Sequence, residues 1–274
     1  MPQPVTVFLR QSLTLNAAIA ACLKDPSIKS VHRLRSSTRR IEATLELLTI
    51  STSLRLRSKA KPLRKILRTL RRAAGAVRDL DVHRKLLKPY RKNHDTAKLE
   101  KDLAATREKS TRKLRTALHK SKKQLHRELT QLETLLQPAV DLSLNATTLL
   151  HLTTTWFAKA IANLDPLQDD QLHSIRKAGK TARYIAEPGV TESGAADSKS
   201  VAALATRFED AQEILGAWHD CLLLLDEARS ILPEQSPTIV QLQEKSVQLR
   251  CRANEAATDL LATFHLPATR NFVH

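Results

Sequence analysis

The sequence predicts an all-α protein built from two copies of one helical unit. The chain has 274 residues but only five glycines, and its apolar residues are mostly Leu and Ala. Sheet-rich proteins need many glycine-containing turns, and Leu and Ala favour helix over strand. Two short motifs also recur at one constant offset, which indicates an internal repeat. A chain of this length is long enough to bury a core.

The repeat conserves both the residue types and the distance between the motifs. A first motif of one histidine and two cations occurs twice, as His32-x-x-Arg35-x-x-x-Arg39 and His173-x-x-Arg176-x-x-x-Lys180. A second motif occurs at the same offset, as Gly75-x-x-x-Asp79 and Gly216-x-x-x-Asp220. The histidine and the glycine are therefore equally far apart in both copies. We expect one domain over residues 1–274, with a first helical bundle at 1–138 and a second at 145–274.

The first unit divides into five helices. Residues 5–23 have helical periodicity through Val5, Leu9, Leu13, Ala17 and Ala20. Asp25 and Pro26 form an N-cap and first-turn proline, which predicts a second helix to about residue 50. A polar loop at 51–58 precedes helices at about 60–77 and from 79 to just before Pro89, and a long charged helix at about 95–136. Glycine inside a helix is costly, so Gly75 predicts either a helix break or a close backbone approach. Asp79 then serves as a cap on the next helix or as a partner of a nearby Arg or His.

The second unit repeats this order, with expected helices at about 145–163, 167–187, 198–218, 220–231 and 238–264. The segment 187–194 contains Pro188 and two glycines, and it is the one loop of flexible composition. It corresponds to 51–58 in the first unit, so it is not a domain linker. The better boundary between the units is the segment 137–145.

The charge of the chain indicates a polyanionic partner. Its net charge is +17 and its pI is about 10.1. Residues 1–140 contain 33 Lys and Arg against 11 Asp and Glu, whereas residues 141–274 contain 12 against 17. Three widely spaced cysteines without a CxxC pair indicate a reducing compartment, so we expect a cytoplasmic protein. No run of about 18 apolar residues occurs, and we expect no membrane span.

The basic residues follow the apolar stripes of two helices at a constant offset. The stripe of the second helix is Val31, Leu34, Thr38, Ile41, Leu45 and Leu48, and that of the third is Leu63, Leu67, Leu70, Ala74 and Val77. Each of the following residues comes directly after a stripe residue in the sequence. They are His32, Arg35, Arg39 and Glu42 on the second helix, and Arg64, Arg68, Arg71, Gly75 and Arg78 on the third. If the helices are adjacent, these two flanks form one basic wall. Like charges at this spacing repel each other, so the wall favours an anion.

These residues resemble those of the CHAD domain family, α-helical domains named for their histidines. The resemblance rests on Val31-His32-Arg33-Leu34-Arg35 with Arg39-Arg40, on residues 70–82, and on the second copies around His173 and Gly216, and it covers about residues 5–265. It implies two helical bundles related by a pseudo-twofold axis around a basic central groove or pore. It also implies binding of inorganic polyphosphate without a cofactor, and association with polyphosphate granules and their proteins.

The expected site is asymmetric. Arg64, Arg68 and Arg71 correspond to Ala205, Glu209 and Gln212, so the second unit lacks their charges. We expect the polyphosphate to be held mainly by the first unit. The expected binding residues are His32, Arg35, Arg39, Arg40, Arg64, Arg68, Arg71, Arg72, Arg78, His173, Arg176, Lys177, Lys180, Arg183 and His219. Gly75, Asp79, Gly216 and Asp220 are expected to be structural.

Two other functions compete with this interpretation. A nucleic-acid binder would use the same charge, but aromatic residues make up only 3% of the chain and none is interleaved with the basic flanks, which disfavours base stacking. Binding to a duplex backbone stays open. A metal-dependent phosphohydrolase would use His173, His219, Asp220 and Asp259. Against this, His219 aligns with Arg78, and an arginine is no metal ligand. We expect neither a metal nor catalysis.

Overall fold

A computed structural model describes residues 1–192 and 198–264, and within these ranges the regular secondary structure is entirely helical. The described α-helices are α1 (Pro4–Lys24), α2 (Ile28–Ser51), α3 (Leu56–Lys59), α4 (Lys61–Leu86), α5 (His94–Leu136), α6 (Ala146–Ile161), α7 (Asp169–Glu192), α8 (Ser198–Ile231) and α9 (Pro237–Phe264). Short 3-10 helices follow α4 and α5, at Lys88–Tyr90 and Gln137–Ala139. The prediction of an all-α protein is confirmed.

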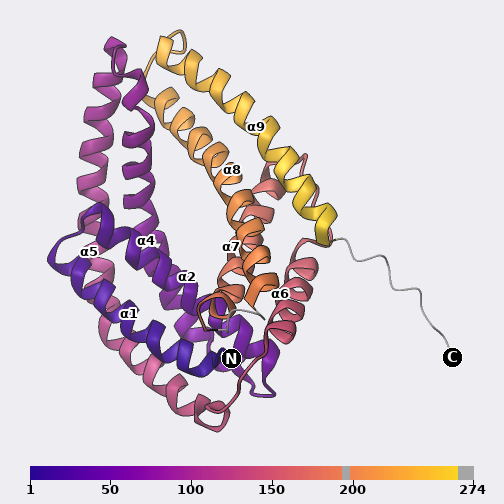
Figure 1. The fold of residues 1–274 in the computed structure, drawn as a ribbon. Coiled ribbons are helices and arrows are strands. Elements are labelled where there is room, and N and C mark those ends of the chain that lie inside the picture. Colours follow the sequence, from indigo (N-terminus) through magenta and orange to yellow (C-terminus); the bar gives the residue numbers. More distant parts are fainter. Residues whose placement is uncertain (193–197, 265–274) are drawn as a thin grey trace.

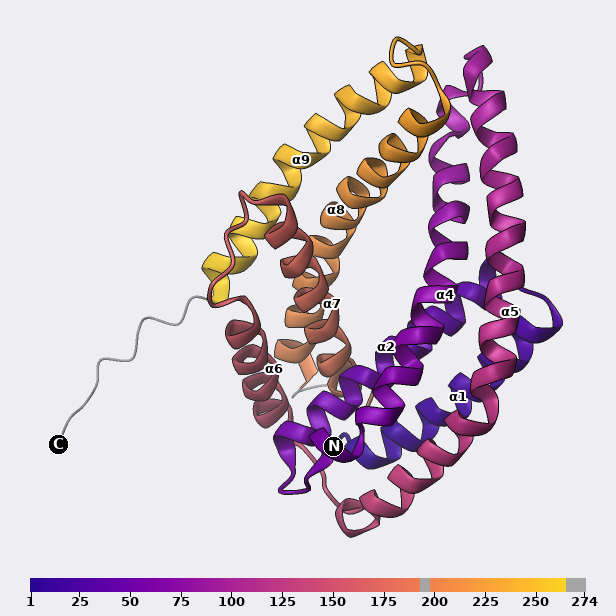
Figure 2. The ribbon, with the colours of Figure 1, turned by 180° about the vertical axis from the view of Figure 1, so that it is seen from behind.

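The helices of the second unit repeat the packing order of the first. α1 packs on α2, α2 on α4 and α4 on α5, and in the second unit α6 packs on α7, α7 on α8 and α8 on α9. The pairs α4/α5 and α8/α9 form two long arms, and α2 packs against α7 near the base of both (Figures 1 and 2). At the arm tips, Asn93 donates a hydrogen bond to Thr238. The pseudo-twofold relation and the division at 138 and 145 stay predictions.

Three apolar clusters hold these helices together. One cluster joins α1, α2, α4 and the C-terminal half of α5, and a second joins α6 to α9 with the arm tip of α4 and α5. A third, which includes Ala43, Leu47 and Ile185, joins α2 to α6 and α7. The predicted second and third helices correspond to α2 and α4. Their predicted stripes are fully buried, and every apolar member is 0% exposed. Those two helices are therefore fixed in rotation, and the residues beside the stripes are fixed with them.

The predicted stripe of α1 is wrong. Leu13 is 71% exposed, whereas Phe8, Leu15, Ile19 and Cys22 are buried in the first core. Two faces of this helix are apolar, and the one with the larger side chains packs inward. α1 is also the one described helix that is long and apolar enough to cross a membrane by length and composition. It packs against α2 and α5, as core helices of the same composition do.

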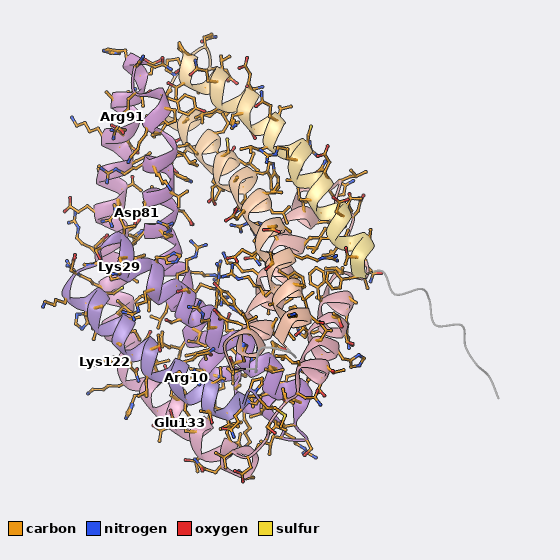
Figure 3. All side chains as sticks on the ribbon, viewed as in Figure 1. Arg10, Lys29, Asp81, Arg91, Lys122 and Glu133 are labelled. Atoms are coloured by element: carbon orange, nitrogen blue, oxygen red, sulfur yellow. The ribbon has the colours of Figure 1, made fainter. Side chains whose placement is uncertain are left out.

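The helix breaks expected at Gly75 and Gly216 do not occur. α4 and α8 run through these glycines, so each replaces two predicted helices. Asp79 does not cap a helix, because its carboxylate binds an arginine of α2. The arms are therefore continuous rods. Asp81 of α4, labelled in Figure 3, joins this arm to α5 by accepting a hydrogen bond of 2.6 Å from Arg107.

Two predicted boundaries are also corrected. Ser27, not Asp25, caps α2, because its hydroxyl accepts a hydrogen bond from the Ser30 backbone N–H. The loop expected at 187–194 is helical as far as Glu192, with Pro188 inside α7, while residues 193–197 lie outside the described residues. Packing explains the second correction, since a Cβ built on Gly189 would lie 2.5 Å from Leu149 and 2.9 Å from Val201. Close packing against neighbouring helices has overridden the loop-like composition.

Candidate functional site

A small cavity lies where α2, α4, α7 and α8 meet, and both copies of the first motif reach it. Its volume is about 150 Å³. We call it the central cavity. It is lined by His32, Arg35, Ser36, Arg39, Arg78, Asp79, Val82, Arg176, Lys180, Tyr184 and Asp220. Six of these eleven are cations or a histidine that the sequence singles out as binding residues. The central cavity thus combines side chains from both copies of the repeat, from His32 near the start of the chain to Asp220.

Two ion pairs at equivalent positions of the repeat stand in the cavity wall. Arg35 Nη1 lies 2.5 Å from Asp79 Oδ1, and Arg176 Nη2 lies 3.9 Å from Asp220 Oδ1. The aspartates therefore act as partners of the motif arginines, the structural role expected for them. The pairing is incomplete, because the buried Nε of Arg35 has no hydrogen-bond partner among the described residues. Each guanidinium has five N–H donors, which is more than one aspartate can bind.

Three further cations of the central cavity form no ion pair within the described part of the chain. They are Arg39, Arg78 and Lys180. Burial, followed by the charge of Arg35, lowers the pKa of the Arg39 guanidinium to about 10. Burial, followed by the charges of Arg39 and Arg176, lowers the pKa of the Lys180 ammonium to about 7. Both shifts mean that the folded protein disfavours these positive charges until an anion compensates them.

The two motif glycines lie against the motif arginines. A Cβ built on Gly75 would lie 3.7 Å from Cζ and Nη1 of Arg35, and one built on Gly216 would lie 4.0 Å from Nε of Arg176. Neither explanation offered by the sequence holds, because both helices are continuous and no neighbouring atom approaches closer than an ordinary van der Waals contact. These distances are ordinary van der Waals contacts and leave room for a methyl group but for little more.

This spacing leads to a prediction for Gly75→Ala. The variant is expected to raise the free energy of unfolding by roughly 0.5–1 kcal/mol, because alanine favours the helical backbone and its methyl group meets no clash. Urea denaturation followed by circular dichroism measures this. The reciprocal control is Ala76→Gly at the exposed neighbouring position of α4, which should lose about the same amount. A destabilised Gly75→Ala protein would show that Arg35 cannot tolerate the methyl group.

The predicted histidines occupy two different environments. His32 lines the central cavity, and burial, followed by the charge of Arg78, lowers its pKa. The rings of His173 and His219 face each other with centroids 4.4 Å apart beside Arg176. Burial, followed by the charge of Lys177, lowers the pKa of His173, while burial and Arg176 lower that of His219 to about 4. All three imidazoles are therefore neutral at pH 7 in the free protein.

One buried histidine was missed by the sequence reasoning. His83 of α4 is 4% exposed, and neither of its ring nitrogens has a hydrogen-bond partner in the described residues. It lines a cavity of about 510 Å³ between α4, α5 and α8, which shares Asp79 with the central cavity and also contains Asp226 and Glu227. Asp79 therefore lies between the basic central cavity and this second, acidic cavity. Only the basic side suits an anion.

Arg40 and Arg183, both expected to bind the ligand, are held at the junction of α2 and α7. Arg40 donates two hydrogen bonds of 2.7 Å to the carboxylate of Glu187, and Arg183 donates one of 2.6 Å to Glu209. The guanidinium carbons of both arginines lie over the ring of Tyr184, at 5.4 and 5.3 Å from its centroid. Glu187 was missed, although it stands at the repeat-equivalent position of Glu46.

The basic row of α4 does not form one wall with that of α2. Arg64 pairs with Glu46 and Arg71 pairs with Glu42, so acidic residues of α2 neutralise the cations that face them. Arg64 and Arg68 line a separate cavity, while Arg72 and Lys177 are exposed. Of the α4 cations, only Arg78 reaches the central cavity. The signal was present in the sequence, because the flank of the second helix changes from cations to Glu42 and Glu46 after Arg39.

The residues of the metal alternative do not gather at one place. His173, His219 and Asp220 lie near Arg176, whereas Asp259 lines a different cavity between α8 and α9 together with Arg207 and Arg252. No group of three His, Cys, Asp or Glu side chains among the described residues is arranged to hold a metal ion.

Comparison with known families assigns the chain. The family model of the CHAD domain matches residues 8–229, which is most of the sequence. The chain belongs to the CHAD domain family. Both copies of the His-Arg motif and both Gly-Asp motifs fall inside the matched region, so the resemblance read from these residues is confirmed.

Two solved structures share this CHAD fold. The crystal structure of the CHAD domain from the plant Ricinus communis superposes with a TM-score of 0.64 at 19% identity, covering 96% of this chain and 91% of that one. PptA from Streptomyces chartreusis superposes with a TM-score of 0.63 at 18% identity, covering 96% and 99% of the two chains. At these identities the similarity establishes the fold alone. No match was found among curated protein sequences.

Proposed function

We propose that this CHAD domain binds inorganic polyphosphate in the central cavity without cleaving it. The observation that carries the proposal is the group of cations Arg39, Arg78 and Lys180, which are close together and lack ion-pair partners among the described residues. Burying such charges is costly unless an anion completes them. Arginine forks and a lysine ammonium are the groups that proteins use to hold phosphate oxygens.

A polymer fits better than a single phosphate because the positive charge extends beyond the cavity. The segment 1–140 carries 33 Lys and Arg against 11 Asp and Glu. Polyphosphate presents a regular row of anions with no base or sugar to recognise, and the central cavity offers cations with one aromatic ring, Tyr184, already covered by two arginines. We place the protein in the cytoplasm at polyphosphate granules, with granule proteins as further partners.

Nucleic acid is the alternative ligand, because a phosphate backbone would meet the same cations. The guanidinium groups of Arg40 and Arg183 both lie over the ring of Tyr184, the one tyrosine of the cavity lining, and they disfavour stacking of a base on it. A nucleic-acid duplex is also too bulky to enter a cavity with a volume of only about 150 Å³. The proposed function therefore predicts preference for the slender polyphosphate chain.

Calorimetric titration of the purified protein with long-chain polyphosphate tests the proposal. Saturable binding is expected, and affinity should fall steeply with salt, by analogy with counterion release from nucleic acids. An unlabelled DNA duplex at equal phosphate concentration should compete poorly. No phosphate should be released on addition of Mg²⁺ or Mn²⁺. Absence of saturable binding at moderate salt would refute the proposal, and release of phosphate would support the hydrolase instead.

A further inference from the structure

A second basic cavity lies on the first unit, away from the central one. It has a volume of about 750 Å³ and lies between the N-terminal half of α4 and the middle of α5. The residues that line this α4–α5 groove are Glu46, Arg57, Lys61, Pro62, Arg64, Lys65, Ile66, Arg68, Thr69, Ser121 and Gln124. Five of them are cations and one is an acid.

Most of the groove's positive charge is uncompensated. Glu46 pairs with Arg64. The other four cations, Arg57, Lys61, Lys65 and Arg68, are exposed and form no ion pair within the described ranges. Ser121 and Gln124 add neutral hydrogen-bond donors along the same walls, whereas the hydroxyl of Thr69 donates to the backbone carbonyl of Lys65. Lys122, labelled in Figure 3, extends the positive charge along the outer side of α5. Uncompensated cations with hydroxyl and amide donors suit a chain of phosphates and repel cationic partners.

The fold itself does not require these cations. The offset that relates His32 to His173 pairs the five basic positions of the groove with Ser198, Ala202, Ala205, Thr206 and Glu209 in the second unit. The same helical framework therefore forms with no positive charge at these places. A framework role shared by both units cannot account for five cations in one copy only, whereas a ligand that contacts one copy can.

One row of α4 connects the groove to the central cavity. Arg64, Arg68, Arg71, Gly75 and Arg78 follow each other at steps of three and four, so they share one face of the helix. Arg68 lines the groove and Arg78 lines the central cavity. At 1.5 Å of rise per residue they stand about 15 Å apart along the helix axis. Between them stand Arg71, which pairs with Glu42, and Gly75, so the two sites are separate clusters of cations. A flexible polyanion held at one end by the central cavity can span this distance and reach the groove.

From these observations we infer that the α4–α5 groove is a second binding site for polyphosphate, occupied by the same chain that enters the central cavity. This inference rests on the proposed function. It makes affinity depend on chain length, because a chain too short to span both sites contacts only one of them. Two linked contacts raise the overall affinity without any change in the central cavity.

A charge-matched pair of variants tests the inference. The groove variant carries Arg57→Gln, Lys61→Gln, Lys65→Gln and Arg68→Gln. The control carries Lys92→Gln, Lys98→Gln, Lys101→Gln and Lys109→Gln, which removes the same charge from exposed positions that line neither cavity. Circular dichroism and thermal unfolding verify that both variants fold. Each is titrated with long-chain polyphosphate and with tripolyphosphate at physiological salt, and long-chain binding is repeated over a salt series.

The groove variant is expected to lose roughly tenfold or more in affinity for the long chain, and its plot of log affinity against log salt should become shallower by about 3. Its affinity for tripolyphosphate should stay unchanged, and the control should bind both ligands like the unmodified protein. Equal losses in the two variants would overturn the inference and leave the proposed function intact. Loss of DNA binding alone in the groove variant would also overturn it, by assigning the groove to nucleic acid. If the unmodified protein binds no polyphosphate, the proposed function itself fails.

Discussion

Replacing Arg39 and Lys180 with glutamine is expected to weaken polyphosphate binding strongly and, at the same time, to make the protein more stable. The two cations lie on α2 and α7, and both line the central cavity. Neither has an ion-pair partner among the described residues, and burial lowers the pKa of both. Their removal takes away the charges on which the proposed binding depends, and affinity should fall by roughly a hundredfold or more.

The gain in stability follows from the same shift. The pKa of Lys180 is about 7 in the folded protein against an ordinary value of 10.5. The unfolded chain therefore binds more protons than the folded one between these two values, and the penalty is complete below pH 7 and absent above about pH 10.5. The Lys180 part of the gain should be roughly 1–3 kcal/mol at pH 6 and little at pH 10. The Arg39 part should mostly remain at pH 10, because the folded pKa of Arg39 is about 10 against an ordinary value of 12.5. The single variant Lys180→Gln therefore isolates the pH-dependent part. Thermal unfolding at the two pH values measures this difference.

A matched control separates this effect from a general loss of charge. Lys98→Gln with Lys101→Gln also removes two positive charges, but both lysines are exposed and line no part of the central cavity. This control should keep most of its polyphosphate affinity and show no pH-dependent change in melting temperature. If the Arg39 and Lys180 variant still bound polyphosphate tightly, the ligand would not occupy the central cavity. If it melted earlier than the unmodified protein, the two cations would have a structural role.

The sequence was sufficient for the fold class and for the rotation of the central helices. The stripes of α2 and α4 are fully buried, so the one-residue offset correctly placed Arg35, Arg39 and Arg78 beside the cores. It was not sufficient for helix continuity. The cost of glycine in a helix is only about 1 kcal/mol, and packing along the arms easily exceeds it. Periodicity on α1 failed because two of its faces are apolar, so hydrophobic pattern alone did not select the buried one.

The candidate site was harder to predict because ion pairing depends on which helix faces which. Glu42 and Glu46 lie on α2 next to α4 and form ion pairs with Arg71 and Arg64. These two arginines therefore do not contribute free charge to the basic wall that the sequence predicted. Glu187 of α7 likewise forms an ion pair with Arg40 of α2, so the charge of Arg40 is compensated. The change from cations to Glu42 and Glu46 along the flank of α2 is visible in the sequence, but which arginine each glutamate binds depends on how the helices pack. His83 was missed because its burial depends on the packing of the arms, and it has no counterpart of the same type in the second unit, where residue 224 is leucine.

Polyphosphate affinity is expected to rise as pH falls from about 9 to about 7, and Lys180 is the group responsible. Its pKa in the free protein is about 7, so near pH 8 most molecules carry it as a neutral amine. An anion in the central cavity favours the charged form and raises this pKa in the complex. Binding therefore takes up a proton between the free and bound pKa values. The contribution of Lys180 to this gain levels off below pH 7, where Lys180 is charged in both states.

The variant Lys180→Arg separates this contribution from every other titration. Arginine stays protonated throughout this pH range, so the variant should bind at pH 8.5 at least as tightly as at pH 7. The histidine of the central cavity contributes at lower pH, because the pKa of His32 is lowered in the free protein and an anion in the cavity raises it. Below pH 6.5 both proteins should therefore gain affinity together.

Proton uptake can be measured directly. Titrations at pH 8 in two buffers with different ionisation enthalpies should give different apparent binding enthalpies for the unmodified protein, and the same value for Lys180→Arg. Long polyphosphate chains are needed, because only their terminal groups titrate near neutral pH and would otherwise contribute protons of their own. A pH-independent affinity between 7 and 9 in the unmodified protein would mean that the ligand does not reach Lys180. A pH dependence that survived Lys180→Arg would assign the proton to another group of the central cavity.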